Sequence, residues 1–233
     1  MYKDHYGTSL PQVDYSDMNG KLIVIEGPDC SGRSSHIHIL RAWLEACGYA
    51  VLSTGLKRSS LVSSMIGKAK EGNILGKKTL SLMYATDFAD QLENKIIPAL
   101  KSGFIVLADR YVFTLIARDI VRGADKDWLS GLFSFAVKPD LVFYMDVDPH
   151  ILLHRAFQKY GHLDYWESGM DLSLSSDMFE SYTIYNNLLR KEYLKLATEY
   201  GFIMVNAGND FKSAQQAFTG KISEFLCIEE PVR

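Results

Sequence analysis

Short apolar runs alternate with longer periodic segments along this chain. The runs are rich in β-branched residues and cover residues 22–25, 49–53, 104–108, 141–145 and 202–205. Continuous runs of this kind are typical of strands buried on both faces, as in a parallel sheet. The segments between them carry apolar residues at helical spacing, so the alternation predicts one α/β domain. We expect a five-stranded parallel sheet with helices on both faces.

The periodic segments predict the helices and their ends. A first helix carries apolar residues from Ile37 onward and stops at Gly48. Asp148 precedes Pro149 as a natural N-cap of another helix. Residues 161–176 are polar, aromatic and rich in glycine without periodicity, which is typical of a mobile lid. The remaining predicted helices cover residues 61–71, 80–100, 113–122, 126–137, 149–159, 177–200 and 211–226.

The segment between the first run and the first helix has the pattern of a phosphate-binding loop. Gly27 and Gly32 are followed by Arg33 and Ser34, close to the pattern GxxxxGK[ST] with arginine in place of lysine. Glycines let backbone N–H groups curl around an anion, and the helix N-terminus adds partial positive charge. Ser34 stands where a hydroxyl would ligate Mg²⁺. An ordinary strand-turn-helix without a ligand is the alternative interpretation.

Composition narrows the class of protein. The 233 residues are 47% hydrophobic and 23% charged with a net charge of −3, an ordinary globular balance that indicates no nucleic-acid partner. No apolar run approaches the ~18 residues of a membrane span, and residues 1–20 do not have the pattern of a signal peptide. Three cysteines without zinc spacing fit a reducing cytoplasm. We expect an N-terminal arm over 1–20, either docked, on the body or on a partner, or disordered, and one domain over 21–228.

Charged residues follow two of the predicted strands. Asp109 and Arg110 come directly after the buried run 104–108, and Lys57 and Arg58 follow the run 49–53. Ligands of open parallel sheets bind at the carboxyl ends of the strands, so these side chains can meet a metal ion or a phosphate. A surface ion pair and a solvated basic turn are the alternatives. A stripe formed by Tyr84 and Phe88 is either core or a base-stacking surface.

Over nearly its whole length, from about residue 21 to 226, the chain resembles P-loop nucleoside-monophosphate kinases, and among them the thymidylate kinase family. The family's DRY motif is similar to Asp109-Arg110-Tyr111, and its PDL is similar to residues 139–141. The end of its long helix resembles IIPAL at residues 96–100, and the Tyr and Glu of its lid are similar to Tyr165 and Glu167. The loop 206–210 resembles the family's adenine-facing loop.

This resemblance implies the three-layer P-loop NTPase fold with a short lid over about 160–176, ATP and Mg²⁺ as cofactors, nucleotide substrates and a homodimer. It also implies site residues. Arg33, Asp109 and Arg110 would act in catalysis, and Ser34 and Asp109 would hold the metal. The donor nucleotide would be bound by Gly27, Pro28, Asp29, Cys30, Ser31, Gly32, Arg33, Ser34, Ser35, Arg155 and Ala207. The acceptor would meet Asp29, Arg58, Phe88, Arg110, Arg118 and Tyr165.

The chain departs from the family pattern mainly around the acceptor. Phe88 stands where the family places an arginine for the acceptor phosphate, and Arg118-Asp119 stands where it offers Tyr-Gln to thymine. The lid 161–176 contains no arginine, so Arg155 or Lys159 would supply the lid cation. The main hypothesis is a kinase that phosphorylates dTMP. A P-loop kinase with a different acceptor and a non-catalytic nucleotide-binding protein are the alternatives.

Overall fold

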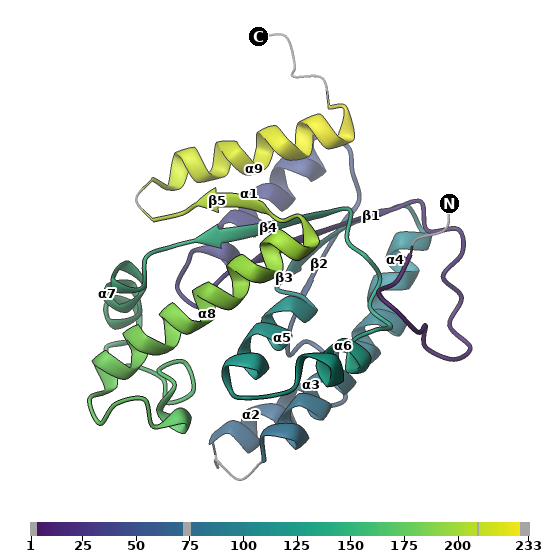
Figure 1. Cartoon of the computed structure of the whole chain (residues 1–233). Helices are drawn as coiled ribbons and strands as arrows, with labels where there is room; N and C mark the ends of the chain where they lie inside the picture. The colour runs from purple at the N-terminus through teal and green to yellow at the C-terminus, as the bar shows by residue number, and fades with distance from the viewer. Residues whose placement is uncertain (1–3, 72–75, 209, 229–233) are drawn as a thin grey trace.

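A parallel sheet forms the centre of the chain (Figure 1). The computed structural model describes residues 4–71, 76–208 and 210–228. Within these residues a five-stranded, all-parallel sheet has the order β2-β3-β1-β4-β5, and β1 and β3 are neighbours as predicted. The strands are β1 (Lys21–Glu26), β2 (Val51–Gly55), β3 (Ile105–Asp109), β4 (Leu141–Asp146) and β5 (Ile203–Asn206).

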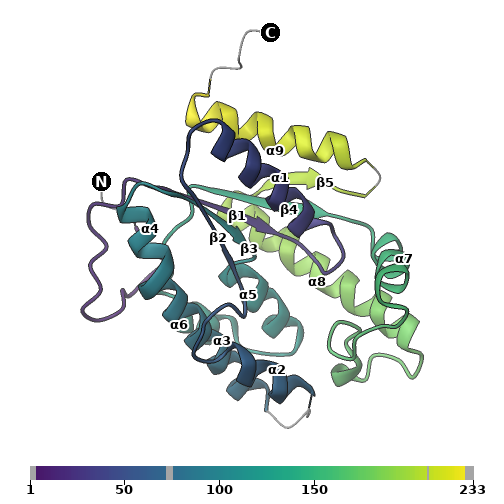
Figure 2. The same cartoon turned by 180° about the vertical axis from the view of Figure 1, so that it is seen from behind.

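Helices cover both faces of the sheet and bury alternate residues of each strand (Figure 2). In β1, Leu22 and Val24 face one core, and Ile23 and Ile25 face the other, all fully buried. The second core is completed by α1 (Arg33–Ala46), α7 (Pro149–Tyr160) and α9 (Phe211–Leu226). The first is covered by α2 (Ser63–Glu71), α3 (Lys77–Gln91), α4 (Ile97–Lys101), α5 (Val112–Val121), α6 (Lys126–Leu132) and α8 (Met178–Tyr200). The predicted three-layer α/β fold is thereby confirmed.

The predicted boundary at Gly48 is confirmed by the backbone. Gly48 has a φ of +90°, and the N–H groups of Gly48 and Tyr49 donate to the carbonyls of Glu45 and Leu44 at 3.0 and 3.1 Å. This pattern is a Schellman C-cap, in which a glycine in the left-handed region closes the helix. Because Tyr49 completes the cap, β2 begins at Val51 and not at residue 49 as predicted.

Other predicted boundaries shift for similar reasons. The predicted helix 126–137 is wrong beyond Leu132, because residues 134–138 pair with the N-terminal arm instead. The predicted helix 80–100 is a continuous helical segment from Lys77 to Lys101, in which a π-helical turn, η1 (Leu92–Ile96), joins α3 to α4. The predicted lid contains only a short 3₁₀ turn, η2 (Met170–Leu172).

Among the described helices, none is both long and apolar enough to cross a membrane.

The N-terminal arm is docked over its described part, residues 4–20. Tyr15 and Met18 are 4% and 0% exposed and belong to the first core. The Tyr15 hydroxyl donates to the carbonyl of Phe135 at 3.0 Å. Of the two alternatives for this segment, the structure therefore supports docking on the body of the domain.

Asp148 is the N-cap of α7, as predicted, and its contribution to stability can be tested by substitution. Its carboxylate accepts the N–H of His150 at 2.8 Å, and Pro149 occupies the first turn. We expect Asp148→Ala to lower the free energy of unfolding by about 1 kcal/mol, the usual contribution of a side-chain N-cap. Asp148→Asn keeps an accepting oxygen and is expected to stay close to the parent chain in urea denaturation. Equal losses in the two variants would contradict the capping role.

Candidate active site

The loop between β1 and α1 has the geometry of an anion cradle. Gly27 and Gly32 have φ values of +152° and +98°, in the region that favours glycine. A Cβ at Gly27 would meet Met145 Cβ and Ser31 Oγ at 3.2 Å, so a side chain there would crowd the loop. The first turn of α1 has neither a side-chain cap nor an acidic residue. The N–H groups of Ser35 and His36 donate to the Gly32 carbonyl at 3.1 and 3.2 Å, and those of Arg33 and Ser34 before them have no intrahelical acceptor, which is the arrangement that binds phosphate.

Arg33 folds back along this loop. Its Nη1 donates to the carbonyl of Gly27 at 2.5 Å and to that of Pro28, and lies 3.3 Å from Ser31 Oγ. Its Nε donates to Asp109 Oδ1 at 2.8 Å. Among the described residues no acceptor meets Nη2 of Arg33, so one corner of the guanidinium stays available to a phosphate oxygen. The guanidinium of Arg33 therefore bridges the loop carbonyls and keeps Nη2 as a further donor. A lysine ammonium is a compact point charge and would contact the loop differently.

Ser34 and Asp109 form the pair that fits a magnesium ion. Ser34 Oγ donates to Asp109 Oδ2 at 2.8 Å, which brings a hydroxyl and a carboxylate together beside the loop. Burial opposes ionisation of Asp109, but Arg33 and the Ser34 hydroxyl outweigh it and hold its pKa below the usual value. Hard oxygen ligands of this kind suit Mg²⁺. No cluster of three or more His, Cys, Asp or Glu is present in the part of the chain described, and Mg²⁺ is usually held by one or two carboxylates with substrate phosphates.

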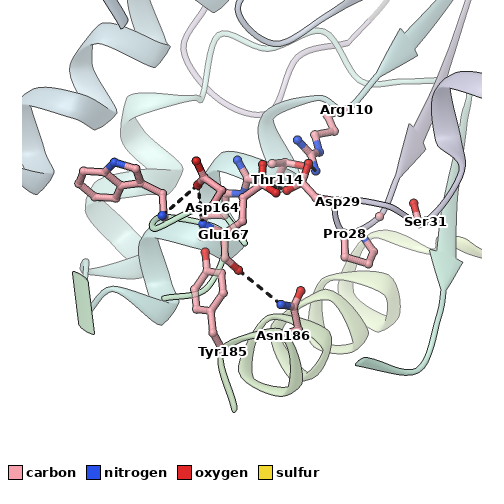
Figure 3. Close-up of polar contacts among 12 residues, drawn as sticks. Pro28, Asp29, Ser31, Arg110, Thr114, Asp164, Glu167, Tyr185 and Asn186 are labelled. Atoms are coloured by element: carbon pink, nitrogen blue, oxygen red, sulfur yellow. Dashed lines mark hydrogen bonds and ion pairs between the residues drawn. The ribbon is translucent and has the colours of Figure 1, made fainter. Parts of the chain in front are cut away.

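Two arginines converge on the carboxylate of Asp29. Arg110 Nη2 and Arg118 Nη2 lie 2.6 and 2.5 Å from its two oxygens. Burial would raise the pKa of Asp29, and the two guanidinium groups overcome this and lower it far below the usual range. Arg110 Nε is buried without a hydrogen-bond partner. Figure 3 shows Asp29 and Arg110 side by side, with Glu167 of the lid close to them. The structure thus brings together Asp29, Arg110 and Arg118, three residues that the sequence assigned to the acceptor.

A cavity next to Arg118 is closed by the lid. Trp166 Nε1 donates to the carbonyl of Lys70 in α2 at 3.1 Å. Arg122 of α5 holds the lid by a two-point ion pair with Asp171, at 2.9 and 3.2 Å, and donates to the Tyr185 hydroxyl at 2.6 Å. The cavity is lined by Lys70, Leu80, Tyr84, Leu115, Arg118, Asp119, Arg122, Trp166, Glu167 and Tyr185. The lid segment therefore lies over a space lined by both charged and aromatic side chains.

Two carboxyl groups of this cavity are pushed toward their neutral form. Burial, reinforced by the negative charge of Asp29, raises the pKa of Glu167, and Arg118 opposes the rise. Burial also raises the pKa of Asp119, against a hydrogen bond of 2.5 Å from Ser81 Oγ. Shifts of this kind cluster at functional sites.

Several predicted acceptor residues lie elsewhere. Phe88 is 3% exposed and its ring packs in the core against Tyr111, Phe133 and Phe135, so this assignment to the acceptor pocket is corrected. Tyr165 is 40% exposed, and the neighbouring Trp166 lines the cavity instead.

The backbone of the basic turn after β2 is anchored by a carboxylate of α3. Lys57 and Arg58 are exposed, and the backbone N–H groups of Lys57 and Ser59 donate to the buried carboxylate of Asp87 at 2.8 and 2.9 Å. The two side chains therefore face solvent, in agreement with the solvated-turn alternative. The helical pattern of residues 80–100 predicts Asp87 on or beside the exposed side, and this prediction is wrong: Asp87 is fully buried, and Gln91 Nε2 donates to its carboxylate at 2.9 Å.

Arg155 lies on the donor side of the loop. Its Nη2 donates to the carbonyls of Ala207 and Gly208 at 3.1 and 2.5 Å, and its Nη1 lies 3.5 Å from that of Ser31. Arg155 therefore links the phosphate loop to the segment after β5, both of which were assigned to the donor nucleotide. Residue 209 of that predicted loop lies outside the described residues.

Glu26 is a buried carboxylate that the sequence analysis also missed. It is fully buried at the end of β1 and accepts the N–H of Tyr111 at 2.8 Å and the Thr114 hydroxyl at 2.5 Å. Burial raises its pKa, against these hydrogen bonds. An acidic residue that ends an apolar strand was the available signal. Glu26 ties the start of α5, and with it Arg110, to the strand that carries the phosphate loop.

Comparisons with known proteins agree with this geometry. The family model for thymidylate kinase matches residues 25–218. "Probable thymidylate kinase 2" of Saccharolobus solfataricus is 38% identical over 210 residues, covering 90% of this chain and 98% of that protein. "Probable thymidylate kinase" of Thermococcus gammatolerans is 30% identical over 88% of this chain and 97% of its own length. "Thymidylate kinase" of Brachyspira hyodysenteriae is 32% identical over 71% of this chain and 82% of its own. The chain belongs to the thymidylate kinase family.

Proposed function

We propose that this chain transfers the γ-phosphoryl group of ATP to dTMP, giving ADP and dTDP. The observation that carries the proposal is the pairing of two clusters around one phosphate loop: Ser34 with Asp109, and Asp29 with Arg110 and Arg118. Phosphoryl transfer depends mainly on positioning and charge neutralisation, and both clusters serve those ends. Family membership favours this reading over a different acceptor and over a non-catalytic nucleotide-binding protein.

On the donor side, the loop amides and the N-terminus of α1 bind the ATP phosphates. Ser34 and Asp109 hold Mg²⁺, which neutralises phosphate charge when bound. Arg33 contributes the free corner of its guanidinium to a phosphate oxygen, while its other nitrogens keep the loop and Asp109 in place. Arg155 orders the segment Ala207–Gly208 next to the loop.

On the acceptor side, Arg110 and Arg118 bind the phosphate of dTMP. A phosphate monoester carries about −1.5 to −2 charges at pH 7, and burying it without cations would be costly. The two guanidinium groups share a single carboxylate, Asp29, so their cluster has a surplus positive charge. The unpartnered Nε of Arg110 offers one more donor. Arg118 in this way takes the place of the cation that position 88 lacks.

The nucleoside part of the acceptor binds under the lid, where the cavity of about 40 Å³ is too small for a nucleoside until the lid moves away. Tyr84 and Tyr185 provide aromatic walls, and Trp166 covers the opening. A closed lid excludes water from the transferring group and so limits hydrolysis of ATP. The lid must open for dTMP to enter, which requires the Trp166–Lys70 and Arg122–Asp171 contacts to break.

The proposal further includes a homodimer in the cytoplasm, as the family resemblance implies. Light scattering of the purified chain tests the dimer: a mass near twice 26.3 kDa supports it, and a mass near 26.3 kDa at all concentrations rejects it.

The direct test is a substrate panel. The purified chain is incubated with ATP, Mg²⁺ and one of dTMP, dUMP, dCMP or UMP, and the diphosphate product is separated by chromatography. We expect dTDP and ADP in equal amounts, with dTMP the best acceptor. Phosphorylation of another acceptor in preference to dTMP would support the different-acceptor alternative. Nucleotide binding without any product would support the non-catalytic one.

Arg118→Ala separates the two substrates. We expect the KM for dTMP to rise roughly 10–100-fold, the effect of losing a charge-assisted hydrogen bond, and the KM for ATP to change little. The exposed Arg41→Ala on α1, which removes an ordinary surface pair with Glu45, serves as the matched control. Equal increases in both KM values would remove Arg118 from the acceptor site.

Ser34→Ala tests the metal pair. Loss of the hydroxyl next to Asp109 is expected to raise the Mg²⁺ concentration for half-maximal activity by about tenfold, because one ligand is lost. Ser34→Thr keeps the hydroxyl and is expected to remain near the parent value. A magnesium titration that is the same for Ser34→Ala and the parent chain would show that Ser34 does not meet the metal.

A further inference from the structure

The N-terminal arm grips one segment of the body by a short antiparallel pairing. His5 and Val137 form a β-bridge, the Tyr6 N–H donates to the Ala136 carbonyl at 3.2 Å, and the Gly7 N–H donates to the Ser134 carbonyl at 2.8 Å. In both Figure 1 and Figure 2 the arm runs beside α4. We call residues 134–138 the gripped segment. It is the stretch that the sequence analysis expected to be helical.

The Tyr6 side chain packs the arm against α5, the helix that follows Arg110 and carries Arg118. Its ring lies edge-on to Phe113 in the first turn of α5, at 5.9 Å between centroids, and to Tyr200 at the end of α8, at 5.4 Å. Lys138 Nζ lies 5.9 Å from the centre of the same ring. Tyr6 therefore contacts α5, α8 and the gripped segment at once.

The gripped segment in turn holds Tyr111. The Tyr111 hydroxyl donates to the carbonyl of Val137 at 2.9 Å, and its side chain is 1% exposed. Val137 is the same residue that bridges His5 of the arm. The Tyr111 ring also packs on Phe113, with 6.3 Å between centroids, so the arm reaches Tyr111 from two sides.

Tyr111 follows a strained residue of the active site. Arg110 has a φ of +72°, which is unfavourable for a non-glycine residue and persists only where the surroundings enforce it. The Arg110 N–H donates to Ile25 at 3.0 Å, and the N–H of Tyr111 donates to Glu26 at 2.8 Å. A further side-chain anchor, besides the Glu26 carboxylate, is the hydrogen bond from the Tyr111 hydroxyl to Val137, the residue that bridges His5 of the arm.

We propose that the arm positions Arg110 for the acceptor phosphate, with Tyr6 as its main positioning residue. The arm packs against the gripped segment and Phe113, and both of these contact Tyr111. Tyr111 in turn stabilises the strained turn at Arg110, which directs the Arg110 side chain toward Asp29 and the acceptor. The family match begins at residue 25, so the arm lies outside the part shared with the family model. This inference rests on the proposed kinase function.

Tyr6→Ala and Tyr6→Phe test the proposal in the full chain. Tyr6→Phe keeps the ring and is expected to behave like the parent. Tyr6→Ala is expected to raise the KM for dTMP at least about fivefold and to leave the KM for ATP within about twofold. Phe218→Leu, a substitution on the buried side of α9, destabilises the opposite core and is the control for a general loss of stability. It is expected to lower the melting temperature without changing the ratio of the two KM values.

A double-mutant cycle tests the route through Tyr111. Tyr111→Phe removes only the hydrogen bond to Val137, and we expect it to raise the KM for dTMP in the same direction. If the arm acts through this bond, Tyr6→Ala adds less in the Tyr111→Phe background than alone. If Tyr6→Ala does not fold, Tyr111→Phe alone still tests the proposal. An unchanged KM for dTMP in Tyr111→Phe then overturns it.

The outcomes separate this inference from the proposed function. Absence of kinase activity in the parent chain rejects the proposed function. An active parent in which Tyr6→Ala lowers the melting temperature without raising the KM for dTMP, or raises both KM values equally, rejects the positioning role alone. Independent effects of the Tyr6 and Tyr111 substitutions reject the route through Val137.

Discussion

Arginine side chains buried beside a phosphate loop are costly to desolvate unless each guanidinium has a counter-charge, and the active site is built around that constraint. Arg33 is paired with Asp109, and Arg110 and Arg118 are paired with Asp29. These ion pairs offset most of the desolvation free energy that isolated buried cations would cost. The two arginines share one ion-paired carboxylate, Asp29, and Glu167 and Glu26 are the further acidic groups within electrostatic reach of them.

The parallel sheet decides which residues take part in this arrangement. Ile25 pairs in register with Asp109, so the residues that follow β1 and β3 leave the sheet at the same edge. Asp29 then comes from one crossover and Arg110 from its neighbour, although they are far apart in sequence. Glu26 adds a second tie between the same two connections by accepting from Tyr111 and Thr114. The distance between donor and acceptor sites is therefore set by backbone register more than by the side chains themselves.

The sequence predicts what depends on local pattern. The apolar runs identify the five described strands, Asp148 and Gly48 mark helix ends, and the charged pair Asp109-Arg110 marks the carboxyl end of β3, whereas Asp29 was assigned from the family resemblance. It fails where long-range packing overrides local preference.

Three cases illustrate these failures. Residues after Leu132 leave the helix because the arm offers them backbone partners that no local pattern announces. Phe88 joins an aromatic core whose other members come from distant segments. Trp166, and not Tyr165, enters the cavity because the lid has no period from which its facing could be read.

In the proposed function, the pairing of Arg110 and Arg118 with Asp29 also constrains how an acceptor phosphate binds. A phosphate approaching Arg110 and Arg118 meets guanidinium groups already bonded to Asp29, so it either shares them or displaces the carboxylate. Sharing is possible because arginine has several donors in a fixed fork and Arg110 keeps its Nε unpartnered. Displacement would leave Asp29 buried beside Glu167, whose pKa is already raised, and like charges in a low-dielectric site repel strongly. The geometry therefore favours an acceptor phosphate that joins the cluster, with Asp29 kept in place as the carboxylate that orients both arginines.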